Sequence, residues 1–73
     1  MLYEQELNEY KELEQNLKDC TEFMERVVII SDMHELSECI YREIGLPKPE
    51  GHPMSYKTLK NLVEKYEKEN IKN

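Results

Sequence analysis

The first 44 residues contain neither glycine nor proline, and the chain has no alanine at all. No apolar run is long enough to span a membrane. Met1 leads directly into acidic residues, whereas a signal peptide begins with a basic and then an apolar segment. The two cysteines, Cys20 and Cys39, lack the spacing of a CxxC pair. These absences predict a soluble, cytoplasmic protein whose thiols are reduced and serve as small core residues.

Signatures of catalysis and of metal binding are also missing. The imidazole and thiol side chains, His34, His52, Cys20 and Cys39, are not spaced as the close ligand pairs of zinc modules. No glycine-rich phosphate loop is present, and no glycine-flanked turn exposes a serine nucleophile. A chain of 73 residues is also too small to enclose a typical substrate pocket. The sequence therefore predicts no enzymatic activity, no cofactor and no metal site.

The longest regular feature is an acidic segment over residues 2–30. Its apolar side chains recur every three or four positions, which places them on one face of a helix. From Tyr10 onward they fit about two and a half heptads, a pattern in which two helices pack together. This pattern predicts a homodimer whose assembly seam consists of Leu13, Leu17, Met24 and Val27. An antiparallel helical hairpin within one chain is equally compatible with the same spacing.

Whether this helix is continuous is left open by the sequence. Residues 19–22 resemble a capping box, with Asp19 as the cap and Glu22 three residues later, so a new helix could start there. The β-branched run over residues 27–30 lowers helix propensity and predicts an end near Ile30. We therefore expect one long helix, or two nearly collinear helices, ending near that residue.

Two further helices are predicted in the rest of the chain. Asp32 caps a short helix over residues 33–44, which Gly45 terminates. The segment 46–53 holds all three prolines and is predicted to be a loop. Ser55 then caps a helix over residues 56–69 with a basic face. The expected fold is all-α: a small three-helix bundle or helical hairpin with one long amino-terminal helix, in a single domain over 1–73.

Charge is distributed unevenly along the chain, whose formal net charge is −6. Residues 1–41 hold eleven acids and three bases, for a charge of −8, and residues 42–73 hold five acids and seven bases, for a charge of +2. Such asymmetry indicates a charged partner. Glu9, Glu12, Glu14 and Glu22 are the candidate contacts to a basic protein surface. An acidic face that only keeps the protein soluble is the alternative.

Three functions are compatible with these patterns. The first is a non-enzymatic regulator or inhibitor that binds another protein through its acidic helix, with a nucleic-acid-handling protein as a candidate partner. The second is a small helix-turn-helix-like DNA-binding regulator that uses Lys57 and Lys60, although a long connection before the helix 56–69 and an acidic overall charge disfavour direct nucleic-acid binding. The third is a structural, self-assembling helical adaptor.

Overall fold

Three helices make up the computed structural model, which describes the backbone of residues 3–71 and the side chains of residues 3–69. They are α1 (Glu4–Asp19), α2 (Phe23–Ile44) and α3 (Tyr56–Ile71), and no strand occurs within residues 3–71. The predicted all-α, three-helix architecture is thus confirmed. Leu2, where the first helix was expected to begin, lies outside the described residues.

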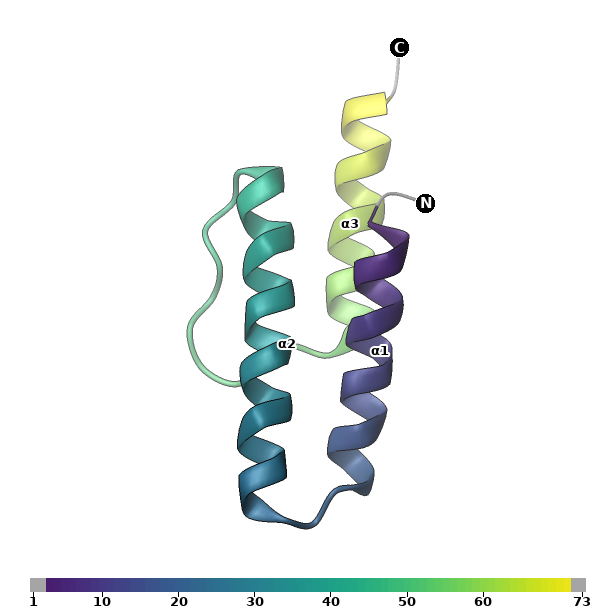
Figure 1. The fold of residues 1–73 in the computed structure, drawn as a ribbon. Coiled ribbons are helices and arrows are strands. Elements are labelled where there is room, and N and C mark those ends of the chain that lie inside the picture. The colour runs from purple at the N-terminus through teal and green to yellow at the C-terminus, as the bar shows by residue number, and fades with distance from the viewer. Residues whose placement is uncertain (1–2, 72–73) are drawn as a thin grey trace.

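The helices α1 and α2 form an antiparallel hairpin, and α3 lies against α1 (Figure 1). The backbone amide of Tyr56, at the start of α3, donates to Glu14 Oε2 at 2.8 Å. From there α3 runs back along α1 toward the amino-terminal end of α1. It therefore covers the half of the hairpin that is far from the α1–α2 turn, and it leaves the turn end as two helices only.

The prediction of one long helix over residues 2–30 is wrong, and so is that of two collinear helices. The chain leaves the helix after Asp19, reverses direction in residues 20–22 and enters α2 at Phe23 (Figure 1). The reversal falls where the sequence resembles a capping box, but Glu22 occupies the cap position and makes no side-chain capping bond. The hairpin, which the heptad pattern left open, is what the chain adopts.

A single arginine stabilises this reversal. Arg26 Nη1 donates to the carbonyl oxygens of Leu17 and Cys20, each at 2.9 Å. The last carbonyl groups of a helix have no partner within the helix, and α1 has no glycine at its end to provide a backbone cap. The guanidinium on α2 supplies those donors instead, and it joins the two helices at the turn.

We expect Arg26→Met, which keeps much of the apolar stem, to lower the free energy of unfolding by about 1.5–3 kcal/mol, the usual contribution of hydrogen bonds to a charged group. Urea denaturation followed by circular dichroism measures this loss. Arg42→Met is the matched control, because Arg42 is exposed and, among the described side chains, pairs with Glu38 alone, one turn away at 3.0 Å. That variant should lose about 0.5 kcal/mol or less. Equal losses in the two variants would contradict the role of Arg26.

The helix break predicted around residues 30–32 is also absent, because α2 continues from Phe23 to Ile44. The β-branched residues 27–30 are helical. Their lower propensity costs only a fraction of a kcal/mol per residue. Packing outweighs this cost, since Ile29 lies against the core and Met33 and Ile40 are buried in it. Asp32 therefore lies within a helix and does not cap one.

The end of α2 and the start of α3 follow the sequence prediction. Gly45 has a φ of 83°, and its amide donates to the carbonyl oxygens of Tyr41 and Arg42. A left-handed glycine in this position is the common way to end a helix. At α3, Ser55 Oγ accepts a hydrogen bond from the amide of Thr58 at 3.2 Å. Both predicted helix boundaries are confirmed.

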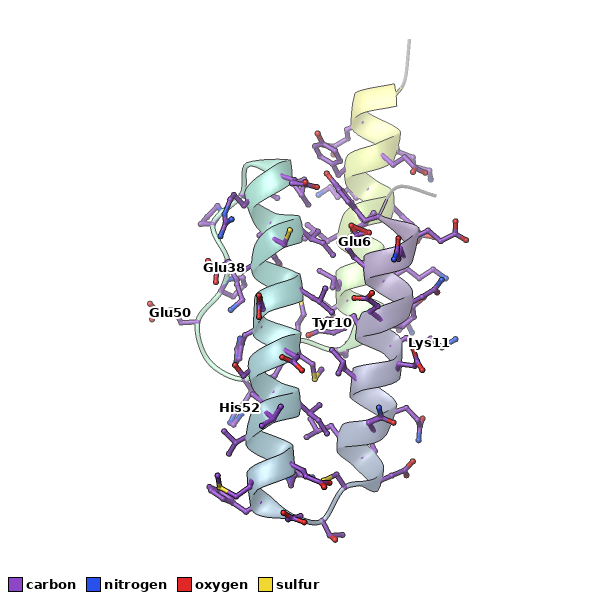
Figure 2. All side chains as sticks on the ribbon, viewed as in Figure 1. Glu6, Tyr10, Lys11, Glu38, Glu50 and His52 are labelled. Atoms are coloured by element: carbon purple, nitrogen blue, oxygen red, sulfur yellow. The ribbon has the colours of Figure 1, made fainter. Side chains whose placement is uncertain are left out.

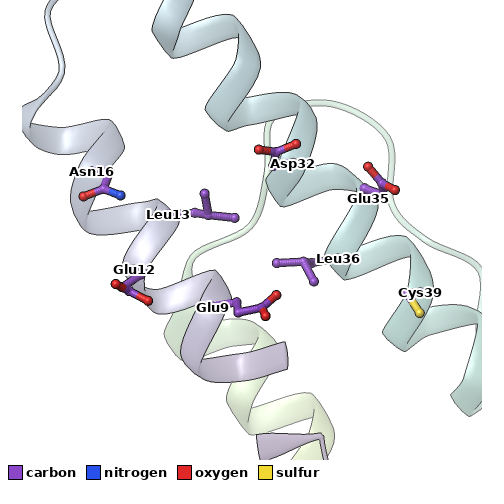
Figure 3. A pocket seen from close by; sticks show the side chains of 8 residues that line it. All are labelled: Glu9, Glu12, Leu13, Asn16, Asp32, Glu35, Leu36 and Cys39. Atoms are coloured by element: carbon purple, nitrogen blue, oxygen red, sulfur yellow. The ribbon is translucent and has the colours of Figure 1, made fainter. Parts of the chain in front are cut away.

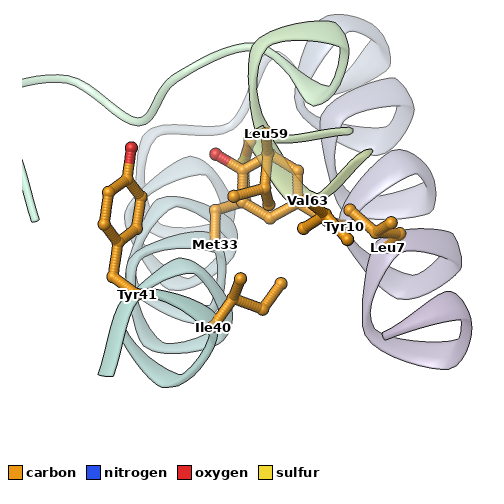
Figure 4. Packing of buried hydrophobic residues seen from close by; sticks show 7 residues of the cluster. All are labelled: Leu7, Tyr10, Met33, Ile40, Tyr41, Leu59 and Val63. Carbon is orange, nitrogen blue, oxygen red and sulfur yellow. The ribbon is translucent and has the colours of Figure 1, made fainter. Parts of the chain in front are cut away.

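The core lies where α3 covers the hairpin, and it takes side chains from all three helices (Figure 4). Tyr10 is fully buried and points from α1 into the bundle (Figure 2). Its hydroxyl donates to the carbonyl oxygen of Met54 at 2.6 Å, which ties α1 to the segment before α3. The buried apolar residues are Leu7, Tyr10, Met33, Ile40, Tyr41, Leu59 and Val63.

Candidate functional site: an acidic groove between α1 and α2

An open groove of about 520 Å³ runs between α1 and α2. Leu13 of α1 and Leu36 of α2 point toward each other across it and form its apolar floor (Figure 3). Its polar lining includes Asn16 and Cys39. Because both leucines are half-buried, the floor is accessible to a side chain that enters from outside.

Four carboxylates surround this floor, two from each helix. Glu9 and Glu12 lie on α1, and Asp32 and Glu35 lie on α2 (Figure 3). All four residues are exposed, and none forms an ion pair or hydrogen bond with another side chain in the described part of the chain. The groove lining contains no basic residue. It therefore presents concentrated negative charge around an apolar floor.

The helix repeat explains why the acids gather here. Glu9 and Glu12 are three residues apart, as are Asp32 and Glu35, so each pair lies on one face of its helix. The side of α1 that meets α3 is different, since it carries Leu7, packed in the core, and Glu14, bonded to Tyr56. The groove and α3 thus lie on different sides of α1, and the groove stays uncovered.

Of the four acids predicted to contact a partner, the structure brings Glu9 and Glu12 into the groove. Glu14 is half-buried and accepts the hydrogen bond from Tyr56 at the start of α3. Glu22 lies exposed in the turn before α2. The sequence therefore predicted one helix face, whereas the structure separates these four residues into three environments.

Asp32 and Glu35 were missed as site residues because the sequence was interpreted as a helix start at that point. A signal for them exists in the sequence. If one helix is assumed from Phe23 onward, Asp32, Glu35 and Cys39 follow each other at steps of three and four, next to Leu36. The acids of the second helix would then have been assigned to one face.

The residues of the predicted assembly seam are divided in the same way. Leu13 and Leu17 are half-buried and pack against the core within the hairpin. Met24 and Val27 are exposed on the first turns of α2, at 65% and 45% of their surface. These four residues could form one seam only if the helix continued through residues 19–22. Because the chain reverses there, they lie on two helices and do not form a single seam.

The exposure of the cysteines and of the two candidate nucleic-acid-binding lysines can also be compared with the prediction. Cys20 and Cys39 are free thiols, half-buried and exposed respectively, so the expectation that both are core residues is wrong. Lys57 is exposed on α3, whereas Lys60 is half-buried. The connection from α2 to α3 spans residues 45–55, far longer than the three or four residues of a helix-turn-helix.

The groove can bind another molecule through two kinds of contact: its carboxylates can pair with positive charge, and its leucine floor can pack against an apolar group. Among the described side chains, no three histidine, cysteine, aspartate or glutamate residues are grouped as metal ligands. Within residues 3–71, no helix has both the length and the apolar character needed to cross a bilayer.

No protein-family model matches the chain, and neither the curated proteins nor the solved structures compared with it include a significant match.

Proposed function

We propose that the chain is a non-enzymatic regulator or inhibitor that acts in the cytoplasm by binding a basic segment of another protein in the groove between α1 and α2. The observation that supports this proposal is the set of four unpaired carboxylates, from two helices, around the apolar floor of Leu13 and Leu36. A lysine or arginine of the partner pairs with the acids, and an apolar side chain of the partner contacts the floor.

The unpaired state of these acids argues for a contact beyond solubility alone. Four like charges around one groove repel each other, and within the described residues no cation forms an ion pair with any of them. A basic partner relieves it, and complementary potentials speed association and exclude acidic partners. A nucleic-acid-handling protein fits this chemistry, because its nucleic-acid-binding surface carries clustered lysine and arginine.

Capture from a lysate of the host, at low and at high salt and with nuclease treatment in parallel, tests the proposal. The groove variant combines Glu12→Lys with Asp32→Lys. The matched control combines Glu50→Lys with Glu64→Lys, two exposed acids outside the groove, so the two variants have the same net charge. Circular dichroism confirms that both are folded.

We expect the wild type and the control to retain a basic nucleic-acid-handling protein at low salt, independently of nuclease, and to release it at high salt. The groove variant should retain at least about tenfold less, because two attractive charge contacts become repulsive. Equal capture by the groove variant and the control would reject the groove as the site. Capture of nucleic acid itself, or of no basic protein, would reject the proposed function.

A further inference from the structure

The groove between α1 and α2 has the same residue spacing on both of its walls. Each wall is made by the first, fourth, fifth and eighth residues of a stretch of its helix, which are Glu9, Glu12, Leu13 and Asn16 on α1, and Asp32, Glu35, Leu36 and Cys39 on α2. Residues at these steps lie on one face of a helix over two turns. Each wall is therefore a ridge of about 10 Å, at a rise of about 1.5 Å per residue.

The antiparallel hairpin places an acid at each end of this groove. Leu13 and Leu36 point toward each other in its middle (Figure 3). Because the two helices run in opposite directions, Asp32 lies at the end nearer the α1–α2 turn, and Glu9 lies at the end farther from it. A molecule that fits the groove therefore needs an apolar group at its centre and a positive charge on either side, about 10 Å apart.

One face of an α-helix meets these requirements. An apolar residue in a helix shares its face with the residue four positions before it and the residue three positions after it. Those two positions are seven residues apart, which is again about 10 Å along the helix axis. Lysine or arginine at both positions can pair with Glu9 at one end of the groove and Asp32 at the other, while the apolar side chain contacts the floor.

Two other common ways of binding a peptide lack their structural basis in this groove. Strand addition requires an exposed sheet edge, and residues 3–71 contain no strand. Proline-rich segments bind grooves lined by aromatic side chains, and no described aromatic residue lines this one. A helix, by contrast, already packs on another side of α1, where Leu59 and Val63 of α3 lie one turn apart and are buried against the hairpin.

We propose that the segment bound in this groove is an amphipathic α-helix of the partner, with a large apolar residue against Leu13 and Leu36 and with lysine or arginine four residues before and three residues after it. The inference rests on the proposed function, because it specifies the form of the basic segment in the same groove. An extended basic chain points successive side chains in opposite directions, so it cannot present these three residues on one face at this spacing. The groove therefore discriminates between basic segments of equal charge by their ability to form this helix.

Synthetic peptides of equal charge test this form. The probe is a capped, fluorescein-labelled peptide of leucine, lysine and glutamine, about 15 residues long, a length at which a helix becomes stable once it is bound. Its leucines form one stripe flanked by lysines. The second peptide contains the same residues, rearranged so that the leucines are spread around the helix. The third is the probe with two glutamines of its outer face replaced by proline, which breaks the helix.

Fluorescence anisotropy at low and at high salt gives the dissociation constants. The proteins are the wild type, the groove variant Glu12→Lys with Asp32→Lys, and the charge-matched control Glu50→Lys with Glu64→Lys. We expect the wild type and the control to bind the probe at least about tenfold more tightly than either other peptide, the effect of burying one large apolar side chain. The groove variant should bind the probe at least about tenfold more weakly than the control does, because two attractive contacts become repulsive.

Three results would overturn the inference. Equal affinity of the wild type for the three peptides would show that charge alone holds a basic segment, which contradicts the helix but leaves the proposed function intact. Equal affinity of the groove variant and the control for the probe would mean that the helix binds elsewhere on the protein. Binding of no peptide at all would also reject the helix. The proposed function fails on a different result, the capture of no basic protein from the lysate, so the two failures are distinguishable.

Discussion

Replacing Tyr10 with alanine should lower the free energy of unfolding by about 3–5 kcal/mol, the usual cost of truncating a buried aromatic residue. Tyr10 is fully buried at the centre of the cluster formed by the three helices (Figure 4). Its removal leaves a cavity and also leaves the Met54 carbonyl without its hydrogen bond. A domain of this size has a total stability of about 4–11 kcal/mol. The substitution should therefore remove a large fraction of the total stability.

Urea denaturation followed by circular dichroism measures this effect, and two variants serve as controls. Tyr10→Phe keeps the ring and loses only the hydroxyl, so it should cost about 1 kcal/mol. Tyr56→Ala truncates a half-buried tyrosine whose ring lies 5.6 Å from Lys11 Nζ, at the edge of the core. It should cost less than Tyr10→Ala. If Tyr10→Ala cost no more than Tyr56→Ala, the core would not be centred on Tyr10.

Alkaline pH should destabilise the fold through the same side chain. Burial, together with the nearby Glu14 and Tyr41, raises the pKa of Tyr10 from 10.0 to about 12. The folded state thus favours the neutral phenol, which alone can donate to Met54. The resulting contribution to stability is complete below a pH of about 10, the pKa in the unfolded chain, and it is lost as pH rises toward about 12.

The free energy of unfolding, measured from neutral pH to about pH 12, should therefore fall steeply in that window for the wild type. Tyr10→Phe has no phenol at this position, and its stability should fall less over the same window. The two proteins differ only at residue 10, so the difference between the two curves reports on Tyr10. Phenolate absorbance at the same pH values follows the ionisation directly. Parallel curves would show that Tyr10 ionises without affecting folding.

The sequence predicted the helical class and two helix boundaries because these depend on local chemistry. Gly45 can adopt the left-handed conformation that ends α2, and Ser55 can accept the hydrogen bond that starts α3. Neither effect requires a distant residue. The α3 bounds differ from the predicted 56–69 only at the carboxyl end.

The reversal at residues 20–22 depends on contacts that no local pattern contains. A heptad spacing fits the packing of two helices from one chain as well as from two chains, because both use the same knobs and holes. Arg26 bonds the end of α1 from another helix, so its role becomes visible only in the folded hairpin. The β-branched run stays helical because Ile29 packs against the core, and this burial outweighs intrinsic propensity.

The sequence by itself determined that the fold is helical, where α2 ends and α3 begins, which side chains of each helix are apolar, and that the first 41 residues are strongly acidic. Tertiary structure alone decided which helix faces meet. It joined Glu9 and Glu12 to Asp32 and Glu35 across a groove, assigned Glu14 to the start of α3, and left Phe23 exposed at the start of α2. The physical reason is that helical periodicity specifies a face of a helix, whereas only the folded chain specifies what lies opposite that face.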